Sequence, residues 1–284
     1  RQGAPEAAAA RRRGTGPKRR RRSKAWIPNQ HGAWAMLAVP TLVGVIRSRG
    51  DLDQVPLVLF WLFGYFAFNA FGVWAASRRK PLNLPPLLVY SALSGVFGVV
   101  TLLLRPDLLR FAPMFLPLIA VAGWAAWTRR ERSMLNDVAT IVAACLFGYV
   151  VYMAGYSPGG TIAHGRSVMA AITVASAAYF VGTAFYVKTI IRERTSRAYK
   201  LASVAYHAAW SVLWAVVAAL IVLPAQPIVV PGMRLRAAVA LTLFFVVLTA
   251  RAWLFGGRKL RPRDVGIGEI VASAVLLVIA VRIW

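Results

Sequence analysis

Long apolar stretches recur along the chain from residue 32 onward, and short polar or basic segments separate them. A helix that crosses the hydrocarbon core of a membrane needs roughly 20 mostly apolar residues. The pattern therefore predicts an all-α membrane protein, a bundle of nine transmembrane helices. We expect these helices at 32–47, 55–77, 82–104, 108–128, 137–156, 167–190, 201–223, 235–255 and 266–283.

The composition supports a membrane protein. Hydrophobic residues make up 59% of the chain and its mean hydropathy is +0.61, whereas soluble domains are about 45–50% apolar. The net charge of +25 would by itself suggest a nucleic-acid-binding protein. The Lys and Arg residues, however, gather in the amino-terminal segment and in short clusters between apolar stretches, where such residues set membrane topology. We therefore expect the lipid bilayer as a partner and no nucleic acid.

The charge pattern also predicts the orientation. Nine helices place the two termini on opposite sides of the membrane. With the amino-terminus inside, 26 of the 34 Lys and Arg residues lie in the cytoplasm, and each inward loop carries more of them than its outward neighbours. We expect the carboxy-terminus outside and the protein in the bacterial inner (plasma) membrane.

The chain divides into two parts. Residues 1–25 are rich in Arg, Lys, Ala, Gly and Pro, so we expect a disordered basic cytoplasmic tail. Residues 26–284 form the predicted nine-helix transmembrane domain. The single cysteine, Cys145, lies inside an apolar stretch, which excludes a disulfide framework and a thiolate metal site. We expect Cys145 to be buried, and we expect no metal or other cofactor.

Polar side chains at membrane depth are costly, so they are candidates for function. In this chain they gather on the predicted cytoplasmic side. His31 lies at the start of the first helix, where it could help to bind an anion or could belong to an interfacial cap. The second helix carries Asn69, followed by Arg78 and Arg79. Asn69 could contribute to a binding site or could serve only interhelical hydrogen bonding.

The loop before the fifth helix holds Arg130, Asn136 and Asp137. Asn136 or Asp137 could cap that helix, and Asp137 could balance the charge of the arginines near it. The same residues could also contribute to an anion site, which leaves two interpretations open.

The sixth helix leads into a loop rich in cations and hydroxyl groups, with Tyr186, Lys188, Arg192 and Glu193 among them. Lys188, Arg192 and Glu193 are at helical spacing and could share one face. Arginine suits phosphate, so this is the strongest anion-site candidate by composition. Membrane topology explains the same charges without a ligand.

Two ionisable residues stand apart inside the later helices. Glu269 near the start of the ninth helix could face a cavity or could favour the helix dipole. His207 in the seventh helix is isolated, and we interpret it as structural.

Three stretches carry a resemblance to a known family. They read Asn-Gln-His-Gly-Ala-Trp-Ala-Met at 29–36, Arg-Ser-Met-Leu-Asn-Asp at 132–137, and Arg-Pro…Gly-Ile-Gly-Glu at 261–269. The chain resembles the YwiC-like family of bacterial membrane proteins over essentially residues 26–284. That resemblance implies a multi-pass membrane protein and assigns no activity.

A more distant likeness is to the UbiA-type prenyltransferases, which are similar in their nine helices, inside amino-terminus and polar sites after helices two and six. The segment 69–82 looks like that family's first aspartate-rich motif, but the aspartate positions hold Ala70, Val73 and Ser77. At the second motif only Glu193 is acidic. The aspartates of that family hold magnesium against a diphosphate, and one glutamate cannot replace them.

Three functions are compatible with these features. The first is binding of an anionic lipid or isoprenoid phosphate in a cytoplasmic-side cavity between the second and sixth helix ends, with metal-independent prenyl transfer as a variant. We expect Asn69, Lys188 and Arg192 to line that cavity. The second is a small-solute carrier, which needs polar groups at mid-membrane depth, and few are evident. The third is a non-catalytic assembly protein, which no sequence feature supports directly.

Overall fold

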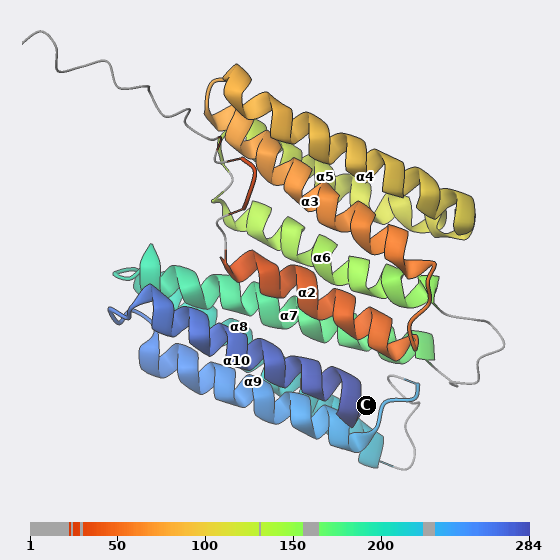
Figure 1. The fold of residues 1–284 in the computed structure, drawn as a ribbon. Coiled ribbons are helices and arrows are strands. Elements are labelled where there is room, and N and C mark those ends of the chain that lie inside the picture. Colours follow the sequence, from red (N-terminus) through yellow and green to blue (C-terminus); the bar gives the residue numbers. More distant parts are fainter. Residues whose placement is uncertain (1–22, 24, 29–30, 131, 156–164, 224–230) are drawn as a thin grey trace, which may run out of the picture.

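The computed structural model describes residues 23, 25–28, 31–130, 132–155, 165–223 and 231–284. Regular structure in these residues is helical throughout, and nine α-helices pack side by side (Figure 1). Their bounds are α2 His31–Arg47, α3 Gln54–Ala76, α4 Leu84–Leu104, α5 Ala112–Trp127, α6 Met134–Ala154, α7 Gly165–Ile191, α8 Arg197–Val222, α9 Leu235–Phe255 and α10 Pro262–Val278. Three short turns flank them: 3₁₀ turns η2 Pro81–Asn83 and η3 Pro106–Phe111, and the π-helical turn η4 Ile279–Ile283.

The bundle confirms the predicted all-α membrane architecture. Within the described residues, eight helices are long and apolar enough to cross a membrane, and the apolar part of α2, Trp34–Arg47, is shorter. The start of α2 and the end of η4 lie at opposite ends of the bundle (Figure 1). We refer to the end where α2 begins as the predicted cytoplasmic end, because its sidedness rests on the charge pattern.

The helices form three neighbouring groups, with α2, α6 and α7 between α3–α5 and α8–α10 (Figure 1). The central helices α6 and α7 are the most buried spans, whereas α4 exposes most of its surface. Side chains such as Tyr179, Leu241 and Phe245 fill the core between α7 and α9. Exposed apolar side chains cover the outer helices, as expected for surfaces that face lipid.

Small residues allow α2 and α6 to approach each other closely. A Cβ atom added to Gly148 would lie 2.5 Å from the carbonyl oxygen of Pro40, and one added to Gly44 would collide with the backbone of Gly148. Helices in lipid gain little from hydrophobic association, so close backbone packing of this kind stabilises their contact. This contact sets the position of the first helix against the core.

Hydrogen bonds to the backbone join helices at the opposite end. Gln54 Nε2 is buried and donates to the Val151 carbonyl oxygen at 2.7 Å and to Ser48 Oγ at 2.7 Å. Arg105 donates to the carbonyl oxygens of Ala154 and Met153. The last turn of α6 therefore accepts hydrogen bonds from the first residue of α3 and from Arg105, which directly follows α4.

Ordered contacts begin slightly before the predicted domain boundary at residue 26. Ser23 Oγ donates to Asn83 Oδ1 at 2.7 Å, and Ala25 is buried. The Tyr90 hydroxyl donates to the carbonyl oxygen of Trp26. Residues 1–22 and 24 of the predicted tail lie outside the described part of the chain, so the predicted disorder of that tail stays a prediction.

Candidate functional site

Two helices at the predicted cytoplasmic end finish with arginine in a backbone conformation that usually belongs to glycine. The φ angles are 59° at Arg78, 60° at Arg79 and 59° at Arg129. The amide of Arg79 donates to the Trp74 carbonyl oxygen at 2.9 Å, which closes the last turn of α3. This is a Schellman-type end, in which the left-handed residue is most often glycine.

The end of α5 has the same construction. The amide of Arg130 donates to the Ala125 carbonyl oxygen at 2.7 Å, and Arg129 has the positive φ. A residue with a Cβ atom costs about 1–2 kcal/mol in this conformation. The strained arginines of both ends lie beside the same pocket, which makes them a functional candidate.

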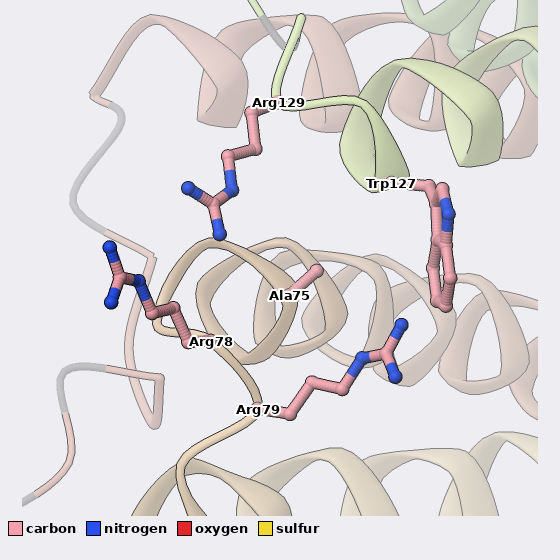
Figure 2. Close-up of a pocket in the computed structure, with 5 residues that line it drawn as sticks. All are labelled: Ala75, Arg78, Arg79, Trp127 and Arg129. Carbon is pink, nitrogen blue, oxygen red and sulfur yellow. The ribbon is translucent and has the colours of Figure 1, made fainter.

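A pocket of about 370 Å³ lies between these two helix ends and is lined by Ala75, Arg78, Arg79, Trp127 and Arg129. We call it the arginine pocket. In Figure 2, Arg129 reaches from the end of α5 toward the end of α3, and Arg79 points toward the Trp127 ring. Arg78 points away from Arg79, so the three guanidinium groups occupy different sides of the pocket.

The arginine pocket is strongly positive. In the described part of the chain, the ion pairs involve other cations, and none joins Arg78, Arg79 or Arg129 to a carboxylate. The guanidinium carbon of Arg79 lies 4.5 Å from the centroid of the Trp127 ring, a cation–π contact that holds this side chain in place. Three cations that make no ion pair with a carboxylate among the described residues favour an anionic ligand.

Lys188 and Asp137 form an ion pair away from this pocket. Lys188 Nζ lies 2.7 Å from Asp137 Oδ2 and donates to the Arg132 carbonyl oxygen at 3.0 Å. The ion-pair partner of Asp137 is thus a lysine on α7 rather than one of the arginines near it in the sequence. Lys188 is buried and already has two acceptors, so it is a connection between α6 and α7.

The start of α6 also differs from its predicted cap. Ser133 is the residue before the helix, and its hydroxyl accepts a hydrogen bond from the Asn136 amide at 3.2 Å. Asn136 and Asp137 lie inside the first turn, so neither is the cap. Asn136 is buried there.

The face predicted to carry Lys188, Arg192 and Glu193 falls at the end of a helix. The helix α7 ends at Ile191, and the amides of Arg192 and Glu193 both donate to the Lys188 carbonyl oxygen in the following turn. Arg192 is exposed. A face shared by these three side chains stays a prediction.

The remaining predicted site residues are distributed around the same end. Arg130 lies over the Trp124 ring at 5.4 Å, outside the lining of the arginine pocket. Asn69 is half-buried on α3, and its Nδ2 atom has no acceptor among the described residues. His31 begins α2, but its side chain lies outside the described part of the structure. The helices α2 and α6 separate α3 from α7 (Figure 1), so one cavity formed by the ends of α3 and α7 stays a prediction.

Sequence reasoning missed a buried ionic network between α7, α9 and α10. Arg251 Nη1 lies 2.7 Å from Glu269 Oε1, and the Thr183 hydroxyl donates to Glu269 Oε2 at 2.9 Å. The Tyr179 hydroxyl lies 3.1 Å from the same oxygen. Arg251 also lies over the ring of the predicted site residue Tyr186, 4.0 Å from its centroid. Glu269, an acidic residue in an apolar helix, is the signal that the sequence offers for this network.

Carboxylate ligands for a hard metal ion do not converge among the described residues. No group of three His, Cys, Asp or Glu side chains is placed to hold a metal ion there. Cys145 is buried inside α6, as expected. The described site offers positively charged side chains to an anion.

Comparison with known proteins gives a consistent assignment. Residues 27–152 match the family described as YwiC-like protein. An uncharacterized Bacillus subtilis (strain 168) protein named YwiC is 31% identical over 256 residues, which cover 90% of this chain and 97% of the relative. A Haemophilus influenzae (strain ATCC 51907 / DSM 11121 / KW20 / Rd) protein described as uncharacterized is 27% identical over the same shares. No solved structure matches the chain. The chain therefore belongs to the YwiC-like family, and the helical bundle of its described residues is that of a multi-pass membrane protein.

Proposed function

We propose that this protein binds the phosphate group of an anionic lipid in the arginine pocket, on the cytoplasmic face of the bacterial inner membrane. The observation that carries the proposal is the set of three arginines, Arg78, Arg79 and Arg129, around one pocket without a carboxylate partner in the described residues. Guanidinium groups form strong charge-assisted hydrogen bonds to phosphate. The ligand class includes isoprenoid phosphates, which carry the same chemistry.

The position of the pocket favours a lipid over a soluble phosphate. Trp127 lines it and is 54% exposed, and the nearby Trp124 is 48% exposed. Tryptophan side chains gather at the level of the lipid head groups. The surfaces of α3, α4 and α5 around the pocket are predominantly apolar and open to lipid. A head group in the pocket would leave its hydrocarbon chain in the bilayer.

The dimensions of the pocket fit a head group and no more. A volume of about 370 Å³ is at the lower end of small-molecule sites. The surrounding arginines point in different directions, so they suit several oxygen atoms of a phosphate and its neighbours. We therefore propose that the pocket recognises a lipid head group. Prenyl transfer is not part of this proposal, because the described residues contain no carboxylate cluster that would hold a metal ion.

The proposal is tested by removing two guanidinium groups without disturbing the helix ends. In the variant R78G/R129G, glycine readily adopts the positive φ of both positions. Arg49→Gly is the matched control, because Arg49 has a φ of 68° two residues after α2. The end of α2 lies at the opposite end of the bundle from the arginine pocket (Figure 1). Each protein is extracted from membranes, and the co-purified lipids are measured by native mass spectrometry.

We expect R78G/R129G to retain about tenfold less anionic lipid than the wild type, as the loss of a charge-assisted hydrogen bond implies. Arg49→Gly should retain the wild-type amount. Equal lipid content in all three proteins contradicts the proposal. Each delipidated protein is then incubated with phosphatidylglycerol or with an isoprenoid phosphate. Comparing the amounts bound identifies which of the two lipids is preferred.

A further inference from the structure

A buried ionic network connects α7, α9 and α10. It is formed by Arg251, Glu269, Tyr179, Thr183 and Tyr186. It lies inside the bundle, away from the arginine pocket. At 1.5 Å per residue, Arg251 lies about 6 Å before the end of α9, and Glu269 about 10 Å after the start of α10. Both side chains are mostly buried, at 17% and 14% exposure. Ionisable groups at this depth are rare and usually serve a function.

The two charged partners are unequally satisfied. The carboxylate of Glu269 receives Arg251 Nη1 at 2.7 Å and the Thr183 hydroxyl at 2.9 Å, and the Tyr179 hydroxyl lies 3.1 Å away. Ser273 Oγ lies 3.1 Å from that tyrosine oxygen and extends the network. Glu269 therefore has a full set of donors.

The guanidinium group is not satisfied in the same way. Arg251 Nε and Nη2 are buried, and neither has an acceptor in the described part of the chain. The Tyr186 ring covers one face of the guanidinium at 4.0 Å and fixes its plane. The free N–H groups thus have a defined direction, and a planar pair of oxygen atoms is the partner that suits them.

A second polar atom without a partner lies on the neighbouring helix. His207 on α8 is 0% exposed, and its Nδ1 atom lies 2.7 Å from the Ser203 carbonyl oxygen. A carbonyl only accepts, so Nδ1 carries the hydrogen of this bond. Nε2 has no partner among the described residues and faces α7 at Gly182, next to Thr183.

We infer that Arg251 binds a second anion inside the bundle, through a carboxylate or phosphate group that accepts from its Nε and Nη2 atoms. The site lies between α7, α9 and α10 and is separate from the arginine pocket. Glu269 positions the guanidinium and offsets its charge, so that the empty protein stays stable at membrane depth. The ligand is either a small cytoplasmic anion or a lipid head group, which share this chemistry.

If Arg251 and Glu269 only stabilise the fold, added anions should not change the stability of the protein. If Arg251 binds an anion, added anions should stabilise it. The protein is placed in nanodiscs of phosphatidylcholine, which has no net charge, and its thermal unfolding is measured at constant ionic strength with sodium phosphate replacing sodium chloride. A phosphate concentration tenfold above the dissociation constant should raise the unfolding midpoint by about 4 °C.

The variant R251M/E269Q removes both charges, and its new side-chain amide keeps an oxygen that accepts from the hydroxyl groups of Tyr179 and Thr183. We expect this variant to lose the phosphate-dependent rise, and we expect R78G/R129G to keep it. A phosphate-dependent rise that persists in R251M/E269Q or disappears in R78G/R129G overturns the inference. If R251M/E269Q does not fold, the variant Arg251→Lys is used instead. The phosphate-dependent rise in its unfolding midpoint should be at most half that of the wild type, and a larger rise overturns the inference.

A second arm separates the two sources of the anion. It compares R78G/R129G with R78G/R129G/R251M/E269Q in nanodiscs with and without phosphatidylglycerol, in chloride only. A lipid-dependent rise that requires Arg251 identifies a head group as the ligand, whereas a response to phosphate alone identifies a soluble anion. Absence of both responses overturns the inference. Because the arginine pocket is already removed in this arm, failure here is distinct from failure of the proposed lipid-binding function.

Discussion

At the scale of single residues, contacts made by glycine decide how closely the helices pack. Gly148 lies against the backbone of Pro40 at the crossing of α2 and α6, whereas nothing lies within 4 Å of a Cβ atom added to Gly95 on α4. The same residue type therefore has opposite roles in the two helices. At Gly148 the absence of a side chain permits the contact, and at Gly95 it only lowers helix propensity.

We predict that Gly148→Ala lowers the free energy of unfolding by about 2 kcal/mol, because the added methyl group meets backbone atoms that cannot move aside. The control Gly95→Ala should raise it by up to about 1 kcal/mol. Both values follow from denaturant unfolding in the same detergent. Equal effects of the two substitutions would show that α2 and α6 do not cross at Gly148.

The pair Arg251–Glu269 supplies a second residue-scale prediction. Glu269→Gln retains a side-chain oxygen for Thr183 but leaves the buried Arg251 without a counter-charge, so it should cost about 3 kcal/mol of unfolding free energy. The double variant R251M/E269Q should recover most of that loss. A double variant as unstable as the sum of its single variants would mean that the two side chains do not interact.

At the scale of helices, small errors in predicted ends changed the interpretation of several site residues. The start of α6 is Met134 rather than residue 137, so the cap is Ser133. The predicted end of the next helix, residue 190, differs by one residue from the observed end of α7 at Ile191. Helix ends depend on a few local hydrogen bonds, and hydrophobicity, which varies gradually along the chain, does not locate them well.

The cap of α6 is testable. Ser133→Ala removes the acceptor for the Asn136 amide and should lower the free energy of unfolding by about 1 kcal/mol. Ser196 caps α8 with a longer contact of 3.3 Å, so Ser196→Ala should cost no more than Ser133→Ala. Unfolding midpoints of the two variants provide the comparison, and an unchanged midpoint for Ser133→Ala contradicts the assignment.

At the scale of the whole molecule, the prediction that matters most is the sidedness of the bundle. We expect the arginine pocket to face the cytoplasm, because 26 of the 34 Lys and Arg residues then lie inside. The test uses a Cys145→Ala background with one new cysteine at the exposed position of Lys80 or Asp51. An impermeant maleimide should label Lys80→Cys in inverted vesicles and Asp51→Cys in right-side-out vesicles. The reverse pattern would place the pocket outside.

The sequence alone determined the number and approximate position of the helices, because a long apolar segment is stable in lipid whatever its neighbours are. It also identified Arg78 and Arg79 as candidates from the basic cluster after α3. It did not single out Arg129 rather than Arg130, because that choice depends on which residue adopts the positive φ at the end of α5.

Only the tertiary structure decided which polar groups meet. Lys188 is paired with Asp137, and Arg251 near the end of α9 is paired with Glu269 on α10. The physical reason is that the transfer of a helix into lipid depends on the composition of that helix alone. An ion pair between two helices depends on how each helix is rotated about its axis and how deeply each side chain lies in the membrane. These quantities are set by side-chain packing between helices far apart in the sequence, such as the close contact of Gly148 with Pro40.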